Sequence, residues 1–228
     1  MLQVNKLDVF HGQSQAVREA SFQVGDLEAL AIMGRNGMGK TTLLKALIGM
    51  LPSRSGQILL DGTDLTAAPS HQRVRSGLAF VPQGRMIFPL LTVEENILVA
   101  LRGEGRTVPE FVYRFFPVLK EMRARRGGNL SGGQQQMLAI ARALVTEPKV
   151  LILDEPTEGI QPSIIKDIAR TLNVLRRERG IAIVVSEQVL SFALDLADRF
   201  LVIDRGRIVH DEPRAELDQD KVRSFLTV

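Results

Sequence analysis

Gly34-Arg35-Asn36-Gly37-Met38-Gly39-Lys40-Thr41 matches the pattern G-x-x-x-x-G-K-[ST], between an apolar run and an amphipathic one. In this setting consecutive backbone N–H groups converge on one phosphate, and the following helix adds the positive end of its dipole. We expect Lys40 to reach the β- and γ-phosphates of a nucleotide and the Thr41 hydroxyl to ligate Mg²⁺. The predicted phosphate cradle comprises Gly34, Asn36, Gly37, Gly39, Lys40, Thr41 and Thr42.

A second motif, Val150-Leu-Ile-Leu-Asp154-Glu155, is an apolar strand that ends in two acids. A carboxylate at the end of a strand beside a phosphate loop can hold Mg²⁺, which makes Asp154 the predicted metal ligand. Glu155 can accept a proton from an attacking water as general base. Acids at a strand end can also serve solubility alone, but the phosphate loop favours the catalytic interpretation.

A third motif, Leu130-Ser131-Gly132-Gly133-Gln134, opens a predicted helix shortly before the acidic strand. Its hydroxyl and free N–H groups can face an anion at the positive end of that helix. An ordinary serine N-cap explains the same residues. The neighbouring phosphate motifs favour the anion-binding interpretation.

The amino-acid composition excludes several classes of protein and of binding site. The chain has 228 residues, 45% of them hydrophobic and 24% charged, which is typical of a globular domain and excludes a disordered chain. It has no cysteine, and His11, His71 and His210 are scattered, so thiolate and histidine metal sites are not expected. A net charge of +3 without a dense basic stripe predicts no nucleic-acid partner. No apolar run approaches a membrane span and no secretory signal is visible, which predicts a cytosolic chain.

Alternating apolar runs and amphipathic stretches predict a mostly parallel sheet covered by helices. Residues 84–145 lack an evident strand and are interpreted as a helical insertion. Strands are predicted at 2–10, 19–24, 27–33, 57–60, 78–81, 150–153, 182–185 and 200–203. Helices are predicted at 41–49, 93–100, 109–116 and 163–179, with another after Gly132.

Together the three motifs resemble the nucleotide-binding subunits of ABC transporters, over nearly the whole chain. The resemblance implies a P-loop NTPase fold of the ABC type. This is an α/β fold with a mostly parallel core sheet, an antiparallel N-terminal β subdomain and an inserted helical subdomain. It also implies a single nucleotide-binding domain over 1–228, with the core at about 1–83 and 146–228 and the helical part at about 84–145. The implied activity is ATP hydrolysis with Mg²⁺ that energises import.

The resemblance also implies residue roles and partners. Gln83 resembles a glutamine that contacts Mg²⁺ or its water and senses the membrane subunit. Ser131, Gly132, Gly133 and Gln134 resemble the segment that touches the γ-phosphate of ATP on the opposing protomer. The implied partners are a second nucleotide-binding subunit (identical or sister), transmembrane permeases and, indirectly, a periplasmic or extracellular solute-binding protein. Such a subunit lies peripherally on the cytoplasmic face of the plasma membrane.

The sequence departs from the family at three places. Gln188 stands where the family usually carries a histidine, and it is predicted to donate to the γ-phosphate, with helix capping as the alternative. Gln161 stands where an aspartate is usual. The aromatic that stacks on adenine is Phe10 by chemistry or His11 by register, and both remain candidates.

Segments 81–89 and 91–96, together with Glu187-Gln188, are similar to the branched-chain amino-acid and urea uptake group. Segment 155–167 resembles the second ATPase subunit of the urea importer. The resemblance therefore predicts a urea importer, with branched-chain amino acids as the alternative. Two further alternatives to an importer subunit belong to other functional classes. One is a soluble ABC-type ATPase that acts on nucleic acid or ribosomes, and the other is a scaffold ATPase for metallocluster assembly. The first of these usually has two nucleotide domains or a long coiled-coil insert.

Overall fold

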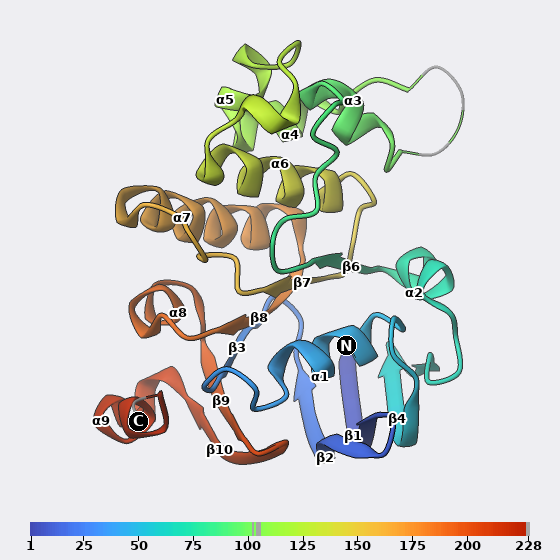
Figure 1. The fold of residues 1–228 in the computed structure, drawn as a ribbon, viewed down its shortest axis with the longest axis vertical. Coiled ribbons are helices and arrows are strands. Elements are labelled where there is room, and N and C mark those ends of the chain that lie inside the picture. Colours follow the sequence, from blue (N-terminus) through green and yellow to red (C-terminus); the bar gives the residue numbers. More distant parts are fainter. Residues whose placement is uncertain (102, 104–105, 227–228) are drawn as a thin grey trace.

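A six-stranded sheet forms the centre of the molecule (Figure 1). The computed structural model describes residues 1–101, 103 and 106–226. The sheet has the order β10-β9-β3-β8-β7-β6, and all its pairs are parallel except β9 with β10. Its strands are β3 (Ala29–Met33), β6 (Leu78–Val81), β7 (Val150–Asp154), β8 (Ala182–Glu187), β9 (Arg199–Asp204) and β10 (Arg207–Pro213).

A second, antiparallel sheet has the order β2-β1-β4-β5. Its strands are β1 (Leu2–His11), β2 (Ser14–Val24), β4 (Ser53–Leu60) and β5 (Thr63–Asp64). β2 and β4 begin earlier than predicted, at Ser14 rather than Glu19 and at Ser53 rather than Gln57. Their opening residues are mostly polar, so hydrophobicity alone did not reveal them.

Nine α-helices are assigned within the described residues. They are α1 (Lys40–Leu47), α2 (Ser70–Ser76), α3 (Val93–Leu98), α4 (Glu110–Phe115), α5 (Pro117–Glu121), α6 (Gly132–Leu144), α7 (Pro162–Arg179), α8 (Leu190–Leu196) and α9 (Gln219–Leu226). Helices α3 to α6 gather beyond α7 at one end of the molecule (Figure 1). Among the described residues from 84 to 145, no strand is assigned and the only β-pairing is an isolated bridge between Thr92 and Arg126.

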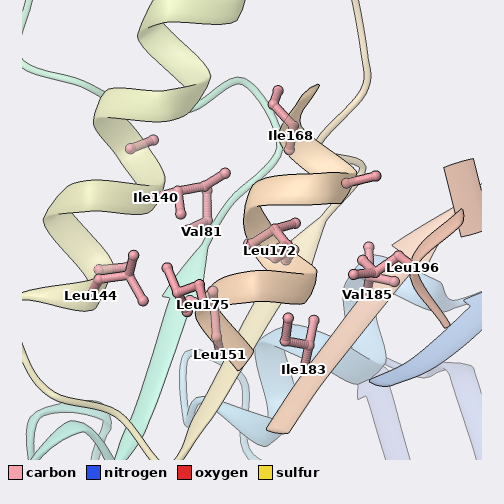
Figure 2. Close-up of a cluster of buried hydrophobic side chains, with 14 of the residues drawn as sticks. Val81, Ile140, Leu144, Leu151, Ile168, Leu172, Leu175, Ile183, Val185 and Leu196 are labelled. Carbon is pink, nitrogen blue, oxygen red and sulfur yellow. The ribbon is translucent and has the colours of Figure 1, made fainter. Parts of the chain in front are cut away.

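Side chains alternate between two cores across the central sheet. Leu151 of β7, like Ile183 and Val185 of β8, faces helices α6, α7 and α8 (Figure 2), and Leu153 belongs to the same core. Their neighbours along the strands face α1 and the antiparallel sheet. Strands β3, β7 and β8 are therefore buried along their whole length, and the polar residues of β7 and β8 lie where these strands end.

Several predicted boundaries change in the structure. The helix predicted at 41–49 runs from Lys40 to Leu47, and Gly49 then takes a left-handed φ of 78°. The helix predicted at 109–116 is α4, and Pro117 starts a new helix because proline cannot continue the earlier one. The expected α/β architecture, with a mostly parallel core sheet, an antiparallel subdomain and a helical region, is confirmed. Within the described part of the chain, no helix is both long and apolar enough to cross a membrane.

Candidate functional site

A cavity of about 460 Å³ opens where β3, β6 and β7 end. The carboxyl ends of parallel strands are where ligands commonly bind in such sheets. Most of the predicted cradle lines this cavity, together with Gln83 and Glu155 from the loops after β6 and β7. Its lining residues are His11, Ala16, Asn36, Gly37, Gly39, Lys40, Thr41, Thr42, Gln83 and Glu155.

Two glycines allow the loop after β3 to pack closely on neighbouring backbone. Gly39 has a φ of 107°, and a Cβ there would lie 2.5 Å from the carbonyl oxygen of Ala16. Gly34 has a φ of 153°, and its Cβ would lie 2.5 Å from the carbonyl oxygen of Ile203. Any other residue would force these segments apart, so the cradle shape depends on glycine at both positions.

The Lys40 side chain curls back over the loop that precedes it. Its Nζ donates to the carbonyl oxygens of Gly34 (2.6 Å) and Arg35 (3.1 Å). The same Nζ lies 3.1 Å from Glu155 Oε1, and Lys40 is only 4% exposed. The ammonium group is therefore held at the junction of the phosphate loop and the acidic strand end.

Asp154 receives two hydroxyl donors on one oxygen. Thr41 Oγ1 donates to its Oδ1 at 3.0 Å and Ser186 Oγ at 2.6 Å. Its other oxygen, Oδ2, is buried and has no hydrogen-bond partner among the described residues. Burial raises the pKa of Asp154, and the hydrogen bonds from Ser186 and Thr41 oppose that rise.

An unpartnered buried carboxylate oxygen beside a threonine hydroxyl fits Mg²⁺, which takes oxygen ligands and keeps several waters. Thr41 and Asp154 would hold the ion, and Gln83 lines the same cavity as Thr41. The described residues include no cluster of three or more His, Cys, Asp or Glu side chains suited to a metal. Phosphate and water oxygens would therefore complete the coordination.

Glu155 accepts hydrogen bonds from two other loops of the site. Its Oε2 accepts from Gln83 Nε2 (3.2 Å), and its Oε1 accepts from Gln188 Nε2 (3.0 Å). Glu155 also has a left-handed φ of 44°, which is uncommon for a residue other than glycine. The structure thus brings together the predicted base, the predicted sensor and the predicted γ-phosphate donor.

Gln188 also donates to Asn36 Oδ1 at 2.7 Å, so it joins the loop after β8 to the phosphate loop. The next helix, α8, has Val189 as its N-cap and no side-chain capping bond. The alternative interpretation of Gln188 as a helix cap is therefore wrong.

The two adenine candidates differ in position. His11 lines the cavity, and its Nε2 lies 3.0 Å from Thr42 Oγ1. Phe10 is not among the lining residues, and its ring lies under the Arg54 guanidinium at 4.8 Å. The structure places His11, rather than Phe10, beside the phosphate cradle.

The segment Ser131–Gln134 lies apart from this cavity. Ser131 is the exposed N-cap of α6 and forms a capping box with Gln134. A Cβ on Gly133 would lie 2.5 Å from Ile164 Cγ2, so close packing against α7 requires glycine there. Gln161 is the exposed N-cap of α7 and makes no capping bond with its side chain. One chain therefore carries two separated sets of predicted nucleotide contacts.

Sequence reasoning missed Ser186 as part of the site and assigned no role to Glu187. In the parallel pairing of β7 with β8, Asp154 lies opposite Ser186. Glu187 follows, and its Oε2 accepts from the Thr157 hydroxyl at 2.8 Å. The polar end of β8 was a visible signal, but its meaning depended on knowing that β8 pairs with β7.

Comparison with known proteins gives consistent matches. The ABC transporter family model matches residues 17–158. The branched-chain amino acid transport ATP-binding protein BraG of Pseudomonas aeruginosa is 42% identical, over 98% of this chain and 97% of its own length. A probable branched-chain amino acid transport ATP-binding protein, LivF of Archaeoglobus fulgidus, is 34% identical over 95% and 94%. A solved ATP-binding cassette of an ABC transporter, MJ1267, superposes with a TM-score of 0.87 at 26% identity, covering 100% of this chain and 99% of that one.

Proposed function

Because this chain belongs to the ABC transporter family of ATP-binding proteins, we propose that it is the ATPase subunit of a branched-chain amino-acid importer. Its ATPase activity and ATP binding follow from the family. Branched-chain amino acids are proposed as the solute on one observation, the 42% identity with BraG over nearly the full length of both chains. BraG and LivF are both named for branched-chain amino acids. These relatives therefore support branched-chain amino acids, the alternative in the sequence analysis, over urea.

The site supports a division of roles. Lys40 and the loop before it bind the phosphates of ATP, Thr41 and Asp154 hold Mg²⁺, and Glu155 activates the attacking water. Gln188, in contact with Glu155, is placed to donate to the γ-phosphate. His11 is the proposed adenine contact.

We further propose that the chain acts as one nucleotide-binding domain paired with a second such subunit. The Ser131–Gln134 segment of each subunit then completes the ATP site of the other. Permease subunits and, indirectly, a solute-binding protein complete the transporter, which places this chain at the cytoplasmic face of the membrane.

An uptake assay tests the proposed solute. Deleting the gene in its own organism should abolish uptake of labelled leucine and leave uptake of labelled urea intact. Wild-type copies should restore leucine uptake, whereas Lys40→Ala copies should not, because the phosphate contact is lost. Loss of urea uptake alone would support urea as the solute. Intact uptake of both would contradict the import function and favour a soluble ATPase.

A second prediction concerns the surface that would meet the permease. Met86, Phe88 and Leu90 are exposed just beyond Gln83. Phe88 borders a hollow of about 390 Å³ that is lined by residues of α2, β6 and α6 and by the segment just after α3. We expect Phe88→Asp to leave the basal ATPase rate of the purified subunit within about threefold, because Phe88 is 48% exposed and does not line the nucleotide cavity. In the assembled transporter the same change should abolish uptake, because a charge replaces an apolar contact.

Val174→Asp is the matched control, because Val174 is also 48% exposed but lies on α7. We expect it to leave both ATPase and uptake near wild type. The Arg142 guanidinium lies 5.3 Å from the Phe88 ring, so an aspartate at 88 gains an opposite charge nearby and the fold should tolerate it. Normal uptake by Phe88→Asp would exclude this surface as the docking site.

A further inference from the structure

Glu187 is a buried carboxylate to which the proposed mechanism gives no role. It ends β8 and is only 2% exposed. A buried charge is costly unless hydrogen bonds satisfy it. Burial raises the pKa of Glu187, and the hydrogen bonds that it accepts oppose the rise.

Three donors satisfy this carboxylate, and they come from two segments of the site. Glu187 Oε1 accepts from the backbone N–H groups of Gln188 (2.9 Å) and Val189 (3.2 Å). Glu187 Oε2 accepts from the Thr157 hydroxyl at 2.8 Å. Thr157 lies two residues after the predicted base Glu155 in the chain. The Glu187 carboxylate therefore joins the turn that contains Gln188 to the loop that contains Glu155.

The side chain of Gln188 extends this connection to the reacting groups. Its amide donates both to Glu155 Oε1 at 3.0 Å and to Asn36 Oδ1 at 2.7 Å. Both contacts require the backbone of Gln188 to stay in one place. Because Val189 caps α8 without a side-chain bond, the bonds to Glu187 hold the backbone of this turn.

We propose that Glu187 is a positioning residue for ATP hydrolysis, which holds Gln188 against Glu155 and the phosphate loop. The proposal rests on the proposed role of Gln188 at the γ-phosphate. Glu187 does not line the nucleotide cavity, and in this proposal its effect on turnover passes through Gln188. Replacing Glu187 should therefore cost no more turnover than removing the Gln188 side chain.

A double-mutant cycle on the purified full-length protein tests this. Gln188→Ala should lower kcat for ATP about tenfold to 150-fold, the range for losing one hydrogen bond to a charged group. Glu187→Ala should lower kcat within that range and leave the KM for ATP within about threefold, because the phosphate loop is intact. In the Gln188→Ala background, Glu187→Ala should lower kcat less than about twofold further.

Two variants separate positioning from a purely structural role. Glu187→Gln should retain kcat within about threefold of wild type, because its oxygen can accept from both N–H groups while its amide donates to the Thr157 hydroxyl. Thr157→Val keeps the side-chain volume and removes only the hydroxyl. Thr157→Val should lower kcat in the wild-type background and should not lower it further in the Gln188→Ala background. If Glu187→Ala does not fold, Thr157→Val serves as the test in its place.

The outcomes are distinguishable. Equal losses from Glu187→Ala, or from Thr157→Val, in both backgrounds would show an effect independent of Gln188 and would overturn the inference. Unchanged kcat in a folded Glu187→Ala, or failure of Glu187→Gln to rescue, would overturn it as well. Wild-type kcat in Gln188→Ala alone would instead refute the proposed role of Gln188, and this inference with it.

Discussion

Replacing Glu155 by glutamine is expected to lower the steady-state ATPase rate about 10²- to 10⁴-fold, the usual contribution of a general base. The amide retains the shape of the side chain, and its single oxygen can still accept from one of the two donors, Gln83 or Gln188, which bind different oxygens of Glu155. It cannot take a proton from water, because a neutral amide oxygen is a very weak base. Lys40 and Asp154 are unchanged, so ATP should still bind. Steady-state phosphate release and equilibrium binding of a fluorescent ATP analogue measure the two quantities separately.

Glu158→Gln is the matched control for this change. Glu158 lies three residues further along the same loop, is exposed and does not line the cavity. The identical loss of charge there should leave turnover within about threefold of wild type. If Glu155→Gln hydrolyses ATP at the wild-type rate, Glu155 is not the base.

The phosphate loop and the acidic strand end could be predicted because each depends on residues adjacent in the chain. Glycines at 34 and 39, a lysine and a hydroxyl between a strand and a helix permit few arrangements, and Gly39, Lys40 and Thr41 line one cavity in the structure. The two-faced central sheet was likewise visible in the apolar runs. Local sequence constrains local geometry strongly enough for these conclusions.

The parts that could not be predicted depend on pairing between distant segments. Ser186 and Glu187 join the site only because β8 lies between β3 and β7 and aligns Ser186 with Asp154. Nothing near Ser186 in the sequence specifies that register. The short helices α2 and α8 were missed for a different reason, since seven residues give too little periodicity to detect.

The transported solute was the least constrained inference. Segments 81–89 and 91–96 resemble the branched-chain amino-acid and urea group as a whole, so they do not separate the two solutes, and the ATPase need never touch the solute. Identity over the whole chain carries more information than a few short segments, and it favours branched-chain amino acids.

The second large effect is expected from Ser131→Arg, which should lower the ATPase rate of the isolated protein about 10²-fold or more. Ser131 is exposed at the start of α6 and does not line the cavity that holds Lys40 and Glu155. A nucleotide in that cavity therefore lacks the donors of the Ser131–Gln134 segment unless a second subunit supplies them. An arginine at this position would block that approach. Nucleotide binding to a single subunit should persist, because every cavity residue is unchanged.

The proposed pairing of subunits also predicts how ATPase activity depends on protein concentration, and a control variant separates this effect from the loss of a helix cap. Wild-type ATPase activity should rise faster than linearly with protein concentration, because in the proposed pairing each complete site needs two chains. Thr92→Arg removes an equivalent capping box, at the start of α3, and should keep most of the activity if loss of a helix cap is all that matters. Equal loss of activity in Thr92→Arg would attribute the effect of Ser131→Arg to the cap. A linear dependence with full turnover in Ser131→Arg would mean that one chain contains the whole site, and the pairing of subunits proposed here would be wrong.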